Sequence, residues 1–156
     1  MIPRYGAPPK QFIRYRLRPG AYAILPRGRD ILLTRQMTPE PDIQLPGGGI
    51  DAGESAIHAL HREVFEETGW LIARPKFFGA FRRFVWMPEY ELWAEKLCKI
   101  FVARPVRPLS DPIEPNHQWY FEDLRSACDD LGNDGDRAML KRFMRARLPQ
   151  RTPTRR

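Results

Sequence analysis

The sequence is poor in the residues that most often hold small proteins together through disulfides or zinc. It has only two cysteines, Cys98 and Cys128, and three histidines in 156 residues. The cysteines form no CxxC pair and show no zinc-ligand spacing with the histidines, which argues against a disulfide scaffold or a zinc-binding module. We therefore expect two reduced thiols that are at least partly buried.

Long apolar runs are also missing. No stretch approaches the roughly 20 residues that an α-helix needs to cross a bilayer. The first 20 residues, MIPRYGAPPKQFIRYRLRPG, carry basic side chains but no apolar segment of the signal-peptide type. We expect a cytoplasmic protein with no membrane partner.

Acidic residues are absent from both ends of the chain. The first 20 residues hold five basic groups and the last 16 hold seven, whereas the middle has 14 basic residues against all 19 acids. Basic ends either attract polyphosphate or RNA or, more commonly, are simply solvated. We interpret residues 1–148 as one domain with a basic N-terminal extension (1–19), followed by a disordered basic tail (149–156).

The apolar patterning predicts a mixed α/β fold. A helix is expected at residues 56–68, with Ser55 as its N-cap and Gly69 as the residue that ends it. The part after residue 121 is expected to be helical, with an amphipathic segment at 137–148. Runs rich in β-branched and aromatic residues predict five strands, at 21–26, 30–36, 71–87, 91–106 and 117–121.

The helix at 56–68 gathers acidic side chains. At about 100° per residue, Glu63, Glu66 and Glu67 share an arc roughly 100° wide. Arg62 lies four residues before Glu66, close enough to orient it through a charged hydrogen bond. The expected buried stripe lies on another face and consists of Ile57, Leu60 and Val64.

A solvated acidic face is the usual explanation for such glutamates. Two features count against it here. The glycine-rich loop PGGGIDAGE (46–54) leads into the helix and brings Glu54 and backbone carbonyls to the same end. Arg62 is also the only Lys or Arg between Glu54 and Gly69. Hard oxygen ligands gathered in this way suit Mg²⁺ or Mn²⁺.

The segment GGIDAGESAIHALHREVFEETGW (48–70) resembles the Nudix box, G-x5-E-x7-R-E-U-x-E-E-x-G-U, where U is a bulky hydrophobic residue. Trp70 is aromatic where an aliphatic residue is usual, and it keeps the hydrophobic character. The match covers 23 of 156 residues. Every other fixed place is filled, by Gly48, Glu54, Arg62, Glu63, Val64, Glu66, Glu67 and Gly69.

This resemblance implies a Nudix fold, with a mixed sheet sandwiched between helices. It also implies metal-dependent hydrolysis of a nucleoside diphosphate linked to another group, with Mg²⁺ or Mn²⁺ bound in part by the carbonyl of Gly47. The chemistry agrees with the residues, because acids cannot hold an anionic diphosphate unless metal ions bridge the two.

The resemblance also implies a role for each acidic residue of the box. Glu66 and Glu67 would ligate the metal. Glu63 would bind it directly or through water, or would act as the base. Arg62 would fix the carboxylates, and Glu54 would support the loop or the metal's outer shell.

Family members often carry one further acidic residue beyond the box. Glu114, in LSDPIEPNHQWYF, is our first choice, because it lies in a proline-rich loop just before a predicted strand, where MutT-type members carry theirs. An ordinary surface glutamate is an equally good interpretation. The rivals lie near the turn between the two long strands and are Glu89, Glu91 and Glu95.

Substrate contacts are less well defined. Arg35, before the glycine-rich loop, and Arg82 and Arg83, on a later strand, are candidates for phosphate or base contacts. Trp86 and Tyr90 are candidates for stacking on a nucleobase. For each of these residues, solvation or packing is the alternative role.

The short chain resembles the MutT-type branch, so we expect a (deoxy)nucleoside triphosphate to be cleaved to monophosphate and pyrophosphate. ADP-ribose, a dinucleoside polyphosphate or a 5′-triphosphorylated RNA end are alternatives, since Pro88 and Tyr90 lie where different branches carry their markers. A nucleotide-sensing module without catalysis is the rival from another class, and the complete set of box glutamates disfavours it. The sequence leaves open a homodimer and a nucleic-acid partner for the basic ends.

Overall fold

The computed structural model describes residues 1–148, and the predicted tail (149–156) lies outside this range. The strands are β1 (Arg16–Ile24), β2 (Pro26–Arg27), β3 (Asp30–Gln36), β4 (Asp42–Gln44), β5 (Gly47–Gly49), β6 (Trp70–Met87), β7 (Leu92–Pro108) and β8 (His117–Asp123). The helices are α1 (Ala56–Thr68), α2 (Leu124–Asp130) and α3 (Asp134–Arg147), and a 3-10 turn, η1 (Pro88–Tyr90), joins β6 to β7.

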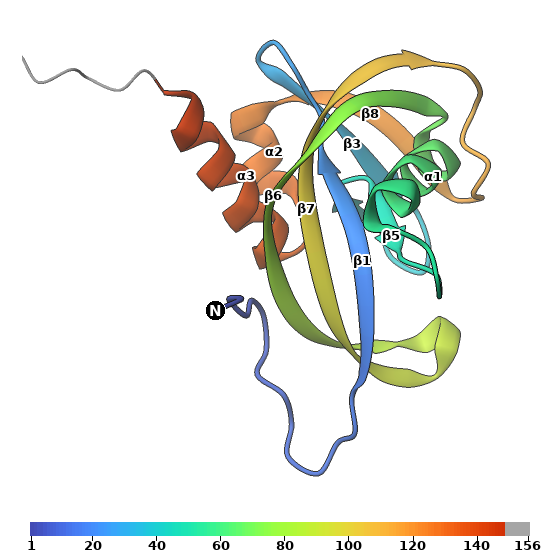
Figure 1. Ribbon diagram of the computed structural model, residues 1–156, viewed down its shortest axis with the longest axis vertical. Coiled ribbons are helices and arrows are strands. Elements are labelled where there is room, and N and C mark those ends of the chain that lie inside the picture. The colour runs from blue at the N-terminus through green and yellow to red at the C-terminus, as the bar shows by residue number, and fades with distance from the viewer. Residues whose placement is uncertain (149–156) are drawn as a thin grey trace, which may run out of the picture.

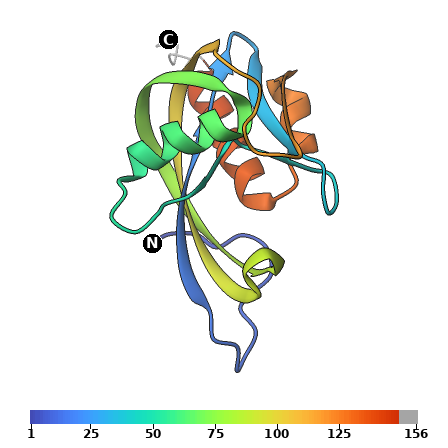
Figure 2. The same ribbon diagram turned by 90° about the vertical axis from the view of Figure 1, so that its right-hand side faces the viewer.

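The strands form two sheets that lie between helices (Figure 1). The first sheet has the order β5-β1-β7-β6, with β1 parallel to β7 and the other neighbours antiparallel. In the second sheet β3 pairs with β2, β4 and β8. Helix α1 covers one side, and α2 and α3 cover the other (Figures 1 and 2). The predicted mixed α/β sandwich is confirmed.

Two apolar cores hold these layers together. Leu60 and Val64 of α1 pack in one core and Leu140 of α3 packs in the other. Neighbouring residues of a strand point to opposite faces, so Leu32 of β3 enters the α1 core and Leu33 enters the α3 core. The strands that carry candidate site residues are therefore fixed from both sides.

Helix α1 has its predicted bounds and caps. Ser55 Oγ accepts a hydrogen bond from the His58 backbone N–H over 3.1 Å, which satisfies a free donor of the first turn. Gly69 ends the helix with φ 71°, a left-handed conformation that glycine adopts at little cost. Local sequence signals were sufficient to place this helix.

The buried stripe of α1 differs from the prediction. Ile57, expected to be buried, is 40% exposed, whereas Glu67 is only 5% exposed. The buried positions continue from Leu60 and Val64 to Glu67, at steps of four and three residues, and leave Ile57 on the exposed first turn. A carboxylate thus takes a place at which apolar side chains are usual.

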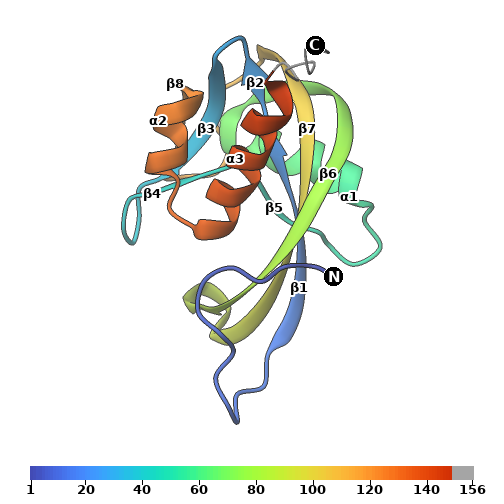
Figure 3. The ribbon, with the colours of Figure 1, turned by 90° about the vertical axis from the view of Figure 1, so that its left-hand side faces the viewer.

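The end of the predicted N-terminal extension (1–19) is built into the sheet. Strand β1 begins at Arg16 and pairs with β7 from that residue. Farther upstream, the Arg82 N–H donates to Pro3 O over 2.9 Å and the Tyr5 N–H donates to Arg82 O over 3.0 Å. Figure 3 shows this N-terminal segment crossing the α3 side of the first sheet. Pairing with β6 and β7, distant in the sequence, explains why the local pattern missed it.

Two short strands and two thiols complete the comparison with the sequence. Strand β4 lies outside the five predicted strands, and β5 lies in the glycine-rich loop, each ordered by a partner strand. Cys98 and Cys128 are buried and free, which confirms the prediction. Within the described residues, no helix is both long and apolar enough to cross a membrane.

Candidate active site

Glu67 is the buried anchor of the site. Its Oε2 accepts a hydrogen bond of 3.0 Å from the backbone N–H of Gly47 on β5. Gly47 has φ 145°, and an added Cβ would lie 2.2 Å from Ala21 O, so the position requires glycine. Burial raises the pKa of Glu67 well above its usual value, and the nearby carboxylates of Glu114 and Glu63 raise it further.

Glu63 lies against the next glycine. A Cβ on Gly48 would come within 2.4 Å of Glu63 Oε2, so the lack of a side chain lets the carboxylate approach the β5 backbone. Burial raises the pKa of Glu63, while hydrogen bonding to Arg62 opposes this shift. Close approach of the Glu63 carboxylate therefore explains the glycine at position 48.

Arg62 joins the box acids to one another. It donates two hydrogen bonds to Glu54, of 2.7 and 2.8 Å, and one of 2.9 Å to Glu63. It also donates to Gly49 O over 3.0 Å and to Glu66, as predicted, over 3.3 Å. The guanidinium lowers the pKa of Glu54 strongly, and Glu54 in turn raises the pKa of Arg62. The Glu54 carboxylate thus accepts hydrogen bonds from Arg62 and from the Asp51 N–H of the loop.

The loop before β8 brings Glu114 to this cluster. The backbone N–H groups of Ile113 and Glu114 donate to Glu66 O over 2.8 and 3.0 Å, which ties the loop to the end of α1. The predicted rivals Glu89, Glu91 and Glu95 join neither of the groups that result. Two sets of potential ligand atoms lie within 4.8 Å of one another: Glu67, Glu114 and His117, and Glu63, Glu66 and Glu114.

These residues fit a divalent cation. Glu63, Glu66, Glu67 and Glu114 bring carboxylate oxygens to one place, and burial disfavours the charged form of two of them. A cation among them would reverse this penalty, because its charge dominates the local field. Oxygen ligands of this kind suit Mg²⁺ or Mn²⁺. That the Gly47 carbonyl joins them as a ligand stays a prediction.

Sequence reasoning missed His117, the first residue of β8. Its side chain is 8% exposed, and its Nε2 lies 3.3 Å from Glu114 Oε2. Its Nδ1 lies 3.3 Å from Thr34 Oγ1 and 3.9 Å from Glu67 Oε1. Burial lowers the pKa of His117, and Glu114 opposes this shift. The spacing Glu-x-x-His at the start of a predicted strand was the available signal.

A cationic row crosses the first sheet beside the acidic cluster. Arg83 of β6 pairs with Lys96 of β7, which pairs with Arg18 of β1, so the three side chains share one face. The charge of Lys96 lowers the pKa of Glu67, which shows that this end of the row is near the carboxylates. Lys96 and Arg18 were also missed, because strand pairing and not local sequence aligns them with Arg83.

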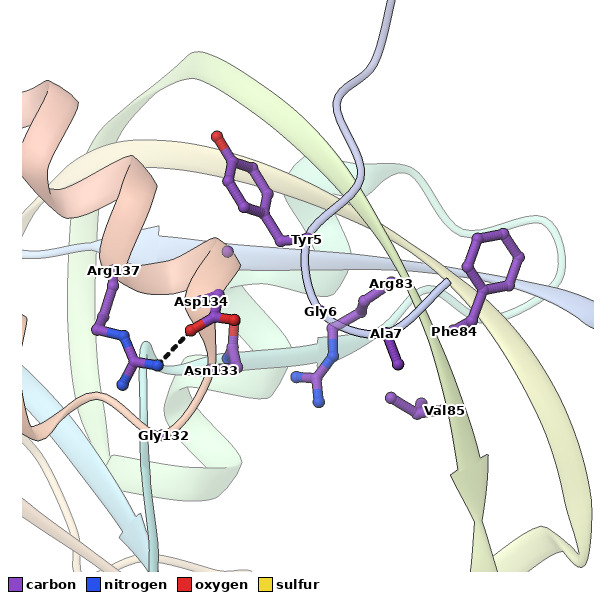
Figure 4. Close-up of a pocket in the computed structure, with 11 residues that line it drawn as sticks. Tyr5, Gly6, Ala7, Arg83, Phe84, Val85, Gly132, Asn133, Asp134 and Arg137 are labelled. Atoms are coloured by element: carbon purple, nitrogen blue, oxygen red, sulfur yellow. Dashed lines mark hydrogen bonds and ion pairs between the residues drawn. The ribbon is translucent and has the colours of Figure 1, made fainter. Parts of the chain in front are cut away.

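A cavity of about 360 Å³ lies at the Arg83 end of this row (Figure 4). The N-terminal residues 5–7 form one wall and the loop that leads into α3 (132–135) forms another. Figure 4 shows the Arg83 side chain extending from β6 into this space. None of the clustered carboxylates lines the cavity. The cationic row therefore runs between the carboxylate cluster, near Lys96, and the cavity, at Arg83.

The other predicted substrate contacts lie elsewhere. Arg82 points to the opposite face from its neighbour Arg83 and pairs with Glu95 over 3.1 Å. The Arg35 guanidinium lies 5.3 Å from the ring centroid of Tyr120. None of these residues belongs to the acidic cluster.

The two predicted stacking residues are exposed near the tip of the β6–β7 hairpin. Trp86 is 45% exposed and lies 5.5 Å, ring to ring, from Trp93. Tyr90 is 54% exposed, and the Arg18 guanidinium lies 4.5 Å from its ring centroid. Tyr90 is therefore linked to the cationic row, and Trp86 is not.

Comparison with known proteins agrees with this geometry. A putative 8-oxo-dGTP diphosphatase of Bacillus subtilis (strain 168) is 39% identical over 75 residues, which are 47% of this chain and 50% of that protein. An RNA pyrophosphohydrolase of Helicobacter pylori (strain ATCC 700392 / 26695) is 39% identical over 57 residues, 33% of this chain and 37% of that protein. The chain thus matches half or less of the length of these relatives.

Solved structures share the fold. A NUDIX hydrolase from Nitrosomonas europaea has a TM-score of 0.69 at 16% identity, over 84% of this chain and 90% of that one. A MutT NUDIX hydrolase from Burkholderia pseudomallei has a TM-score of 0.64 at 23% identity, over 81% and 97%. The family model of the NUDIX domain matches residues 15–143, from the start of β1 into α3. The chain therefore belongs to the Nudix hydrolase family.

Proposed function

We propose that this chain is a metal-dependent pyrophosphohydrolase that converts a (deoxy)nucleoside triphosphate to its monophosphate and pyrophosphate. One observation carries the proposal: four converging carboxylates stand next to a row of cationic side chains that leads to a cavity. Such a site can hold cations among its acids and the anionic parts of a nucleotide along its basic row.

The residues that would hold a divalent cation are Glu63, Glu66, Glu67 and Glu114, with the carbonyl of Gly47. Bound there, Mg²⁺ or Mn²⁺ would neutralise the charge of the phosphates and lower the pKa of the attacking water. We propose that activity depends on a metal because burial raises the pKa of the neighbouring Glu63 and Glu67 carboxyl groups, and a cation would favour their charged forms.

The chain's own groups position and activate the reactants. Lys96 and Arg83 bind phosphate oxygens, and Arg62 holds the Glu63 and Glu66 carboxylates in place through its hydrogen bonds. Glu63, whose carboxylate Arg62 holds over 2.9 Å, binds the metal directly or through water, or accepts the proton of the attacking water. Water attacks a phosphorus of the nucleotide's triphosphate group, the P–O–P bond breaks, and pyrophosphate leaves.

The test is a substrate panel with Mg²⁺ or Mn²⁺, with products resolved by chromatography. It contains ordinary and oxidised (d)NTPs, ADP-ribose, Ap4A, NADH and a 5′-triphosphorylated RNA. The parent chain should cleave a triphosphate, Glu67→Gln should not, and Glu89→Gln, at an exposed glutamate, should match the parent. Nucleotide binding without cleavage of any member would replace the proposal with a sensing module.

A 5′-triphosphorylated RNA end is the second candidate. Two observations favour it: the partial match to the Helicobacter pylori RNA pyrophosphohydrolase and the basic residues of the N-terminal segment. RNA contacts outside the site should make the KM for the RNA rise steeply with salt, whereas the KM for a free nucleotide should change less. Equal salt dependence for both substrates would count against it.

A further inference from the structure

We propose that His117 is a nitrogen ligand of the metal in this site, so that the site favours a first-row transition cation such as Mn²⁺ over Mg²⁺. The inference rests on the proposed function, in which the carboxylates hold a divalent cation. The residues assigned to the metal so far offer oxygen atoms, so His117 changes the chemical character of the site.

The position of His117 fits direct ligation. Its side chain is 8% exposed, and Nε2 lies 3.3 Å from Glu114 Oε2, while the other ring nitrogen, Nδ1, lies 3.9 Å from Glu67 Oε1. Ligand atoms that bind one ion at about 2.1 Å lie about 3 to 4 Å from one another. The Nε2–Glu114 separation is therefore that of two atoms that can share a cation, and one ligand atom each of Glu67, Glu114 and His117 lie within 4.8 Å of one another.

Thr34 gives the imidazole a defined orientation. Its hydroxyl, fully buried on β3, lies 3.3 Å from His117 Nδ1. With the proton on Nδ1, the ring donates to Thr34 Oγ1 and turns the lone pair of Nε2 towards Glu114. Metal-bound histidines usually have their second ring N–H held by an oxygen in this way. A lone pair that faces a carboxylate is unfavourable unless a cation lies between them.

The register of the second sheet keeps this arrangement rigid. His117 pairs with Gln36 on β3, two residues beyond the Thr34–Trp119 pair. The loop that carries Glu114 is tied to α1 through Glu66 O. Three separate elements therefore supply Glu67, Glu114 and His117 at fixed places, as a preorganised metal site requires.

The metal preference follows from the donor atoms. Mg²⁺ prefers oxygen ligands in near-octahedral geometry, whereas imidazole nitrogen suits first-row transition ions. Loss of the imidazole should therefore weaken Mn²⁺ binding more than Mg²⁺ binding. A residue that only positioned Glu114 would affect both metals alike.

The first measurement is pulsed EPR of the full chain with Mn²⁺, which detects nitrogen nuclei coupled to the bound ion. We expect an imidazole ¹⁴N modulation that changes when the chain is labelled with ¹⁵N-histidine. The signal should vanish in His117→Gln and persist in His61→Gln, a matched change on the exposed side of α1. The labelling arm needs no substitution, so it stands even if a variant fails to fold.

The second measurement is calorimetric titration of each metal. In His117→Gln the Kd for Mn²⁺ should rise about tenfold or more, and the Kd for Mg²⁺ should stay within about twofold. Equal losses for both metals, or Mn²⁺ bound without nitrogen modulation, would overturn the inference.

The outcomes separate this inference from the proposed function. Hydrolysis of a panel substrate with an oxygen-only Mn²⁺ site overturns the role of His117 alone. Nitrogen-coupled Mn²⁺ in a chain that cleaves nothing overturns the hydrolase proposal alone. A chain that binds no Mn²⁺ contradicts both.

Discussion

Helices α1 and α3 are similar in length and are capped by Ser55 and Asn133, yet their charges are arranged in opposite ways. Helix α3 carries Asp134 and Asp136 in its first turn and Arg145 and Arg147 in its last, which complements the helix dipole. Helix α1 has no acid in its first turn and no basic residue in its last, where Glu66 and Glu67 lie instead. The charges of α3 stabilise a helix, whereas those of α1 oppose it.

Each helix also buries one carboxylate against the same stretch of backbone. Glu67 of α1 accepts from Gly47 N–H over 3.0 Å, and Asp136 of α3 accepts from Leu45 N–H over 3.3 Å. Burial raises the pKa of both. Arg83 and Lys96 lower the pKa of Asp136, whereas Glu67, on which Lys96 also acts, has its pKa raised further by Glu114 and Glu63. The contrast teaches that an acid at a helix C-terminus, buried among other acids, marks a site for a cation.

Glu67→Gln should give the largest effect. Turnover should fall about a hundredfold or more, because the change removes a proposed ligand, and loss of mere outer-shell partners already costs about 10–100-fold. Asp136→Asn, the matched change on α3, should keep most of the activity. Steady-state kinetics on a cleaved substrate measures both variants, and similar losses in the two would erase the distinction between the helices.

Removing one core leucine from each helix sharpens the comparison. Leu60→Ala and Leu140→Ala should each lower the free energy of unfolding by about 2–5 kcal/mol, because both side chains are fully buried. The kcat of the folded fraction should fall in Leu60→Ala, which underlies the box glutamates, and should hold in Leu140→Ala. Urea unfolding and kinetics measure the two effects. Equal kcat values in both variants would show that the packing of α1 does not set the site geometry.

The metal-free protein should lose stability as the pH rises. In the native state Glu67 keeps its proton to a higher pH than in the unfolded chain, where its pKa is near 4.5. The native state therefore binds more protons than the unfolded state. The stability that Glu67 contributes is fully present below pH 4.5 and is lost as the pH rises through the raised pKa of the native state. Burial also raises the pKa of Asp136, so this residue changes stability with pH in the same direction.

Addition of a divalent cation separates the two contributions. At 100 times its Kd, the cation should restore about 2.7 kcal/mol at pH 8. We expect this gain in the parent and in Asp136→Asn, but a much smaller one in Glu67→Gln. Thermal melts from pH 5 to 8, with and without Mn²⁺, test this. A full gain in Glu67→Gln would remove Glu67 from the metal site.

The smallest effect should come from the charged ends of α3. Asp134→Asn removes an exposed first-turn acid and its ion pair with Arg137, so it should cost about 0.3–1 kcal/mol of stability. A destabilisation that does not weaken with salt would argue against a dipole effect, because surface electrostatics are screened.

The sequence was sufficient where structure is determined locally. Ser55 and Gly69 fixed the bounds of α1, and runs rich in β-branched and aromatic residues located β3, β6, β7 and β8. The box spacing also predicted that Glu63, Glu66 and Glu67 lie near one another. These features depend on helical and strand periodicity, which a single segment carries.

Pairing between distant segments could not be predicted. His117 reaches Glu67 because β8 pairs with β3, and Lys96 joins Arg83 because β7 pairs with β6. The exposure of Ile57 depends on where α1 meets the sheet, which its amphipathic pattern does not specify. The candidate site was thus predicted as the box acids with Glu114 and Arg83, without the imidazole of His117 and without Lys96 and Arg18, which strand pairing aligns with Arg83.

The hydrogen bonds of Arg82 with Pro3 and Tyr5 bear on self-association. Strand β6 is the outer strand of its sheet, and an uncovered edge offers a template on which another chain can add a strand. The N-terminal segment occupies part of this edge, and Pro3, Pro8 and Pro9 have no N–H to donate, so the segment is a poor template itself. The first residues of the chain therefore help to keep β6 from joining neighbouring molecules edge to edge.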